Sequence, residues 1–186
     1  FEWLEKSVKT ADPEAREKMH NASTMAGMAF ANAFLGMSHS MAHKIGGVHH
    51  TVHGRTNAIL LPYVIRYNGT RPSKTTTWPK YNYWKADEKF QDIAKMLGLP
   101  HSTPEEAVEA YAKAVYELGV AVGIKMNFKD QGIDEKAWKD SLHEIALLAY
   151  EDQCSPANPR LPMVADMEEI MADAYYGYAE RPGRRK

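Results

Sequence analysis

The spacing of apolar residues along this chain is mostly that of amphipathic helices. Stripes that repeat about every 3.6 residues recur in four separate segments and predict a helix in each. Their apolar members are Phe90, Ile93, Ala94 and Leu97; Val108, Tyr111, Ala112, Val115 and Leu118; Trp138, Leu142, Ile145 and Ala149; and Met167, Ile170, Met171 and Ala174. No convincing pair of alternating strands and no fixed internal repeat is visible. The pattern therefore predicts an all-α fold, a helical bundle.

Capping residues indicate where several of these helices begin. Asp12-Pro13-Glu14 predicts a helix start, because an acidic N-cap is followed by a proline at the first helical position. Thr103-Pro104-Glu105-Glu106 resembles a capping box, and Asp134 is a second acidic cap. We expect the first helix to continue through small residues and then through His43, as one long helix or two in series broken near residues 21–24. The paired Gly46-Gly47 is its expected stop.

The remaining segments are identified by their proline, glycine and other turn-forming residues. Residues 57–65 are apolar on all sides and predict a buried helix, with Pro62 as a kink or boundary. Residues 68–83 carry the longest loop signal, residues 152–159 a compact turn, and residues 163–176 a last amphipathic helix. We expect one helical domain over residues 1–180 and a frayed basic tail over 181–186. Methionines along the first helices, such as Met25, Met28, Met37 and Met41, are expected to fill the core.

Composition excludes several classes of function. The 186 residues suit one domain, and 23 Lys plus Arg against 24 Asp plus Glu leave no basic field for nucleic acid or an anionic membrane. No apolar run approaches the roughly 18 residues that span a bilayer. The single cysteine, Cys154, rules out an internal disulfide, suits a reducing cytoplasmic setting and is read as part of a structural turn. Because the chain starts with Phe1 and lacks a signal-peptide pattern, we expect it to be a piece of a longer protein.

Histidine is the residue whose distribution is uneven. Five of the eight histidines lie between positions 39 and 53. His39 and His43 are one helical turn apart on the same face, where two imidazoles could form half of a metal site. His53 follows the expected glycine stop, and a chain that turns back there could bring His53 next to His39 and His43. On spacing alone the alternative stays open, namely histidines that cap helices or bond buried carbonyls; the adjacent His49 and His50 should diverge.

The run from Gly36 to Gly47, Gly-Met-Ser-His-Ser-Met-Ala-His-Lys-Ile-Gly-Gly, followed by His53-Gly54-Arg55-Thr56-Asn57-Ala58, resembles the signature of the iron-containing, group III alcohol dehydrogenases. The resemblance implies that His39 and His53 are metal ligands. It also implies that His43 lies beside the nicotinamide and the substrate and takes part in proton transfer. Val52 departs from the family pattern, which usually has proline before the His-Gly pair.

Later segments extend the resemblance to the carboxyl end of the bifunctional aldehyde-alcohol dehydrogenases. They are residues 81–99, 125–134 and 152–160 and the ending Ala174-Tyr175-Tyr176-Gly177. This implies an NAD-dependent enzyme that interconverts a short-chain aldehyde such as acetaldehyde and its alcohol. The metal would be Fe²⁺, with Zn²⁺ as the alternative. The parent protein would be a homo-oligomer, and the resemblance implies assembly into a helical filament.

The family also implies what this chain does not contain. An Asp and a His that complete the metal site, and the dinucleotide-binding domain, are expected upstream of Phe1, so no cofactor-binding residue is assigned and the isolated chain is expected to be inactive. The alternative function is a helical assembly or interaction module in which the histidines are structural.

Overall fold

The computed structural model describes residues 1–72 and 84–177, and all regular structure in these two ranges is helical. The prediction of an all-α fold is confirmed. The elements are α1 (Leu4–Thr10), α2 (Pro13–Ala33), α3 (Met37–His49), α4 (His53–Gly69), α5 (Ala86–Met96), α6 (Pro104–Ala121), α7 (Glu135–Glu151), the 3-10 turn η2 (Ser155–Ala157) and α8 (Val164–Tyr176). Most of the predicted loop, residues 73–83, and the basic tail lie outside the described residues. Within those ranges, no helix has both the length and the apolar character needed to cross a bilayer.

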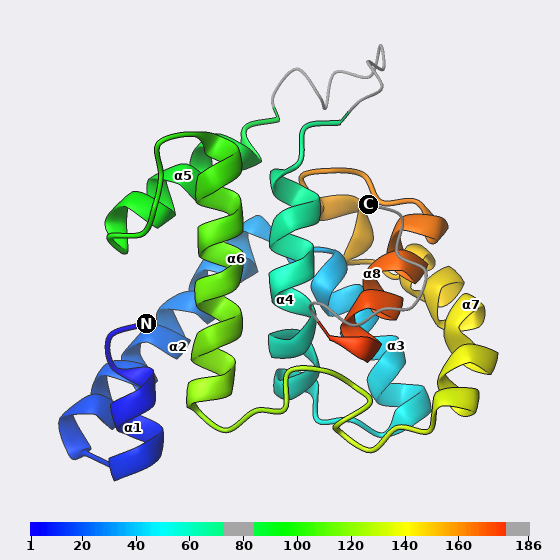
Figure 1. Ribbon diagram of the computed structural model, residues 1–186, viewed down its shortest axis with the longest axis horizontal. Coiled ribbons are helices and arrows are strands. Elements are labelled where there is room, and N and C mark those ends of the chain that lie inside the picture. Colours follow the sequence, from blue (N-terminus) through cyan, green and yellow to red (C-terminus); the bar gives the residue numbers. More distant parts are fainter. Residues whose placement is uncertain (73–83, 178–186) are drawn as a thin grey trace.

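Helix α4 stands at the centre of the bundle (Figure 1). It packs against α6 on one side and against α3 and α8 on the other, while α7 covers α3 and α8 and α5 lies on α6. Helices α1 and α2 pack on each other at one side of the molecule. The main core lies between α3, α4, α7 and α8, where the Trp138 ring stacks between Phe128 at 4.9 Å and Tyr175 at 5.2 Å between ring centroids.

The predicted capping residues begin their helices as expected. The Asp12 carboxylate accepts a hydrogen bond from Ala15 N–H, and the Asp134 carboxylate accepts one from Ala137 N–H, both at 2.9 Å. Thr103 Oγ1 accepts from Glu106 N–H at 3.2 Å. The Glu106 carboxylate bonds the N–H of Ser102 rather than of Thr103, so the box is displaced by one residue.

Two expected boundaries around the histidines are wrong. The break between the first two long helices falls at residues 34–36 and not near 21–24, because Gly36 lies directly against the Asn158 side chain. A Cβ at position 36 would lie 2.8 Å from Asn158 Oδ1, so this close approach requires glycine. Helix α3 also runs through Gly46-Gly47 to His49, since packing against α4 and α7 outweighs the low helix propensity of two glycines. Pro62 lies inside α4.

The methionines of α2 do not fill the core. Met37 and Met41 on α3 are buried as predicted, but Met25 and Met28 are 69% and 65% exposed. Among the described helices the main partner of α2 is α1, which leaves most of the α2 surface uncovered. The apolar residues of α2 that sequence reasoning assigned to a core therefore have no core to enter within the described part of this chain.

Candidate metal centre and active site

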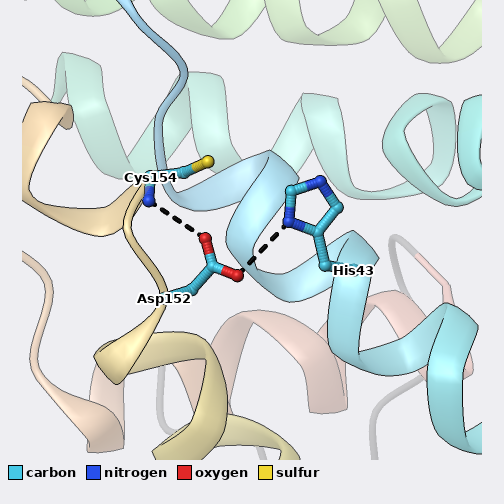
Figure 2. Close-up of side chains that lie close together, drawn as sticks. All are labelled: His43, Asp152 and Cys154. Atoms are coloured by element: carbon cyan, nitrogen blue, oxygen red, sulfur yellow. Dashed lines mark hydrogen bonds and ion pairs between the residues drawn. The ribbon is translucent and has the colours of Figure 1, made fainter.

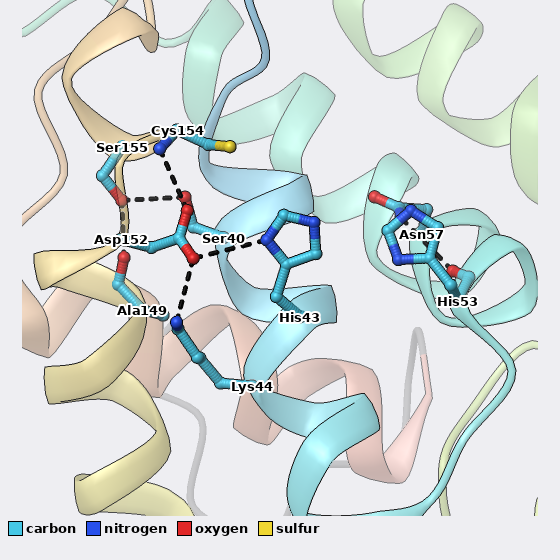
Figure 3. Close-up of polar contacts among 9 residues, drawn as sticks. All are labelled: Ser40, His43, Lys44, His53, Asn57, Ala149, Asp152, Cys154 and Ser155. Atoms are coloured by element: carbon cyan, nitrogen blue, oxygen red, sulfur yellow. Dashed lines mark hydrogen bonds and ion pairs between the residues drawn. The ribbon is translucent and has the colours of Figure 1, made fainter.

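The structure brings the three histidines selected from the sequence into one cluster. His39 and His43 project from the same face of α3, and His53 is the first residue of α4. The ring centroid of His53 lies 5.3 Å from that of His39 and 5.3 Å from that of His43, and the centroids of His39 and His43 are 6.1 Å apart. Figure 3 shows the His43 ring between Asp152 and His53. The short link of residues 50–52 turns the chain back so that α4 starts beside α3.

Ring tilt, rather than ring separation, distinguishes the His39–His53 pair from the His43–His53 pair as candidate metal ligands. An imidazole bound at about 2.1 Å has its centroid about 3.3 Å from the ion, so two ligands at a tetrahedral angle have centroids roughly 5.4 Å apart. The His39 and His53 rings, at 5.3 Å with planes inclined by 51°, match this spacing. Imidazole lone pairs lie in the ring plane. The stacked rings of His43 and His53, only 17° from parallel, do not direct theirs toward a common point.

The surroundings of His39 favour the neutral imidazole that a metal ion requires. Burial, followed by the charges of His53 and His43, lowers the pKa of His39. Its ring also lies 6.3 Å from the ring of Phe30, centroid to centroid. At neutral pH the His39 ring is therefore uncharged and carries a lone pair.

His53 is held by Asn57, one helical turn later on α4. The Asn57 amide nitrogen lies 3.2 Å from His53 Nε2 and donates to the His53 carbonyl at 3.2 Å, while Ser38 Oγ donates to Asn57 Oδ1 at 2.9 Å. An amide NH₂ group can only donate, so Nε2 is the nitrogen of His53 that bears the lone pair. This contact orients the ring, and a metal ion on Nε2 would displace the amide hydrogen.

On the other side of His43, the Asp152 carboxylate lies buried against α3 (Figure 2). The Asp152 side chain is 7% exposed and accepts from three groups. Oδ2 lies 3.3 Å from His43 Nδ1 and 3.0 Å from Lys44 Nζ, and Oδ1 accepts from Cys154 N–H at 3.0 Å. Burial acts to raise the pKa of Asp152, but the hydrogen bonds from Cys154, Lys44 and His43 outweigh it and hold the pKa well below its usual range. The carboxylate is therefore charged throughout the physiological range.

His43, Asp152 and Cys154 form a group of potential ligand atoms that all lie within 4.8 Å of one another. Two observations argue against a metal ion there. Burial and then the neighbouring Asp152 raise the pKa of the Cys154 thiol to about 11, whereas a metal ligand must be the thiolate. The Asp152 carboxylate already has a cation, Lys44, at 3.0 Å. The raised thiol pKa and full burial of Cys154 agree with its reading as a residue of a structural turn.

The turn that carries Asp152 is attached to α3 at three successive levels. At the start of α3, Asn158 Oδ1 accepts from Met37 N–H at 3.2 Å. One turn later, the buried hydroxyls of Ser40 and Ser155 lie 2.9 Å apart. A further turn along, Asp152 meets His43 and Lys44 (Figure 3). Residues 152–158 therefore run alongside α3 and fix Asp152 beside His43.

The other two histidines of the sequence cluster lie apart from this site. His49 Nε2 is 2.9 Å from Ser141 Oγ, and its ring lies 5.3 Å from the Trp138 ring, centroid to centroid. Burial, and then the charge of His50, lowers the pKa of His49. His50 ends α3 in a left-handed conformation with φ 54°. His49 is thus a packing residue between α3 and α7, and His49 and His50 diverge as expected.

Sequence reasoning missed Asp152, Lys44 and Asn57 as neighbours of the histidines. Asp152 is 109 positions from His43, and no local periodicity connects residues at such a distance. Asn57 could have been found, because it lies four residues after His53 on a segment that was predicted to be helical.

Comparisons with known proteins show the family of the chain. The chain matches the model of the Fe-containing alcohol dehydrogenase family, C-terminal, over residues 1–175. It is 79% identical over 186 residues to an aldehyde-alcohol dehydrogenase of Streptococcus pneumoniae serotype 2 (strain D39 / NCTC 7466) and 60% identical over 179 residues to aldehyde-alcohol dehydrogenase 2 of Entamoeba histolytica. These alignments cover 100% and 96% of this chain but 21% and 20% of the two relatives, so the chain spans about a fifth of their length.

A solved structure described as 1,3-propanediol oxidoreductase superposes with a TM-score of 0.79 at 33% identity, covering 94% of this chain and 42% of that one. The helical fold and the family match over nearly the whole chain agree. The chain belongs to the Fe-containing alcohol dehydrogenase family and corresponds to its C-terminal, helical region.

Proposed function

We propose that this chain is the metal-facing and substrate-facing helical part of an NAD-dependent alcohol dehydrogenase. The enzyme interconverts a short-chain aldehyde, such as acetaldehyde, and its alcohol. The observation that carries the proposal is the convergence of His39, His43 and His53 from two helices, with His39 and His53 at the spacing of two ligands of one ion. Membership of an Fe-containing family favours Fe²⁺, and Zn²⁺ is the alternative with the same nitrogen ligands.

His39 and His53 would hold the ion. When bound, the ion supplies Lewis-acid stabilisation of negative charge on the substrate oxygen, and the nicotinamide supplies or accepts the hydride. Partial burial and the charges of His53 and His43 lower the pKa of His39 and favour its neutral ring, and Asn57 keeps the His53 ring in one orientation before the ion enters. The two rings therefore present a preorganised pair of nitrogen ligands.

His43 would move the proton that the reaction gains or releases. Its side chain is 36% exposed, so one edge of the ring is open to a substrate while Nδ1 is directed to Asp152. In aldehyde reduction the ring would donate a proton to the substrate oxygen as the alcohol forms. In alcohol oxidation it would accept the hydroxyl proton.

The rest of the active site would come from the rest of the full-length protein. Its relatives named aldehyde-alcohol dehydrogenases are about five times longer than this chain, and we infer a parent that joins an aldehyde dehydrogenase to this alcohol dehydrogenase. Two further ligands, an Asp and a His, and the dinucleotide-binding domain would lie there. We further infer a cytoplasmic homo-oligomer that assembles as a filament, in which partner segments cover the exposed apolar side chains of α2.

The test is an assay of the full-length protein under anaerobic conditions with NADH and acetaldehyde. We expect NADH oxidation that a chelator abolishes and that added Fe²⁺ or Zn²⁺ restores. The same assay in the reverse direction, with NAD and ethanol, should show the same dependence on metal. Full activity that survives removal of all bound metal would contradict the proposal.

A further inference from the structure

The Asp152 carboxylate contacts the imidazole edge of His43 that faces away from His53 (Figure 3). We propose that Asp152 is a positioning residue of the dehydrogenase, which keeps the proton of neutral His43 on Nδ1 and leaves Nε2 to exchange a proton with the substrate oxygen. The inference rests on the proposed function, since it assigns how the proton-carrying histidine of that reaction is oriented. The contact that carries it joins His43 Nδ1 and Asp152 Oδ2 at 3.3 Å.

The protonation pattern follows from the acceptor character of a carboxylate. An ionised carboxylate can only accept hydrogen bonds, and Asp152 remains ionised because of its donors. The nitrogen of His43 that faces it must therefore bear hydrogen, and in the neutral ring this leaves the lone pair on Nε2.

The position of the Asp152 carboxylate is fixed by several contacts besides the one with His43. Cys154 N–H holds Oδ1, and Lys44 Nζ shares Oδ2 with His43. Asp152 N–H itself donates to the Ala149 carbonyl at the end of α7 at 3.2 Å, and the Ser155 hydroxyl donates to the same carbonyl at 2.6 Å. These bonds fix the Asp152 carboxylate beside α3. The carboxylate in turn holds the Nδ1 edge of the His43 ring.

The experiment is a double-mutant cycle in the full-length enzyme, with kcat, KM for acetaldehyde and bound metal measured for each variant. Asp152→Asn should lower kcat by about 10- to 100-fold, because an amide can donate to Nδ1 and so allows the wrong tautomer. KM should change by less than about threefold and the metal content should stay at the wild-type level. In a His43→Ala background, adding Asp152→Asn should lower kcat by less than about twofold, since its partner is already absent.

The matched control is Glu151→Gln, which removes the neighbouring, exposed carboxylate of α7 and should leave kcat unchanged. Equal losses from Asp152→Asn with and without the His43 imidazole would overturn the inference and show a purely structural role. Loss of metal would overturn it in favour of Asp152 as a ligand, and an unchanged kcat would overturn it outright. If Asp152→Asn does not fold, Asp152→Ser, whose hydroxyl can still accept from Cys154 N–H, enters the same cycle with the same criteria.

Failure of the proposed function would look different from failure of this inference. In the first case the wild-type enzyme itself would show no metal-dependent oxidation of NADH by acetaldehyde. In the second case the wild-type enzyme and its metal requirement would be as proposed, and only the coupling between Asp152 and His43 would be missing.

Discussion

Removing the Asn158 side chain should destabilise the chain more than its size suggests. Its amide makes four hydrogen bonds: Oδ1 accepts from Met37 N–H at 3.2 Å and from Asn68 Nδ2 at 3.3 Å, and Nδ2 donates to Asn68 Oδ1 at 2.7 Å and to the Arg160 carbonyl at 2.6 Å. Asn158→Ala deletes all four bonds at once. It therefore detaches the start of α3 from the turn that carries Asp152.

The magnitude follows from what is left behind. Met37 N–H and the Asn68 amide are buried, and each buried polar group without a partner costs about 1–3 kcal/mol. Two such groups give about 2–6 kcal/mol, and water entering the vacated space recovers part of it, so we expect a loss of roughly 3 kcal/mol. For a domain of this size, that corresponds to a fall in Tm of about 6–12 °C.

The assay is urea unfolding of the 186-residue chain, followed by circular dichroism, with a thermal scan alongside. The control is Asn32→Ala, which removes an exposed amide that donates to the Met28 carbonyl one turn earlier, and should change the stability by less than about 0.5 kcal/mol. If Asn158→Ala is no more destabilising than Asn32→Ala, the turn is not anchored to α3 by this side chain and the reasoning fails.

Three further predictions concern the same chain. Burial, and then the charge of His50, lowers the pKa of His49, so as the pH falls below about 6.5 the unfolded state takes up a proton on this ring before the folded state does. The urea concentration at the unfolding midpoint should therefore decrease as the pH is lowered from about 7.5 to about 5.5. His49→Gln should make this decrease smaller, and a decrease of the same size would contradict the assignment. A Cβ on Gly69 would meet the stiff Val108 side chain at 2.5 Å, whereas one on Gly119 would meet the flexible Met126 side chain. Gly69→Ala should therefore lower the free energy of unfolding in urea by about 1–3 kcal/mol, and Gly119→Ala by less than about 1 kcal/mol. The reverse order would refute the packing argument. Finally, the isolated chain should be helical by circular dichroism but should not oxidise NADH with acetaldehyde and Fe²⁺, because two imidazoles hold metal weakly and the described residues form no dinucleotide-binding loop. Turnover near that of the full-length enzyme would show that the cofactor site is misplaced.

Local signals predicted most of the helices, and the spacing of the histidines indicated that His39, His43 and His53 could lie together, as they do. Asp12, Thr103 and Asp134 each cap the helix that they were predicted to start. The end of α3 could not be predicted in this way, because Gly46 and Gly47 lie inside a helix whose stability comes from neighbours far along the chain. Likewise the break at Gly36 is set by Asn158, 122 positions later, through a contact that no pattern near Gly36 indicates.

The surface of α2 and the position of Asp152 show two further limits. Apolar residues at helical spacing predict a buried face, but the periodicity does not say which molecule or segment covers it, and Met25 and Met28 are exposed in this chain. Asp152 was read as part of a compact turn, which is correct, yet its contact with His43 depends on how α7 packs on α3. A residue whose role comes from tertiary packing has no signature in a single sequence.

The central claim is that His39 and His53 bind the metal while His43 carries the proton. The most direct measurement is bound metal and kcat, side by side, for His39→Ala, His53→Ala and His43→Ala in the full-length enzyme, with His49→Ala as the control. The account predicts that the first two lose both metal and turnover, that His43→Ala keeps its metal and loses turnover, and that the control keeps both. If His43→Ala lost metal as completely as the other two variants, the division between ligands and proton carrier would be contradicted.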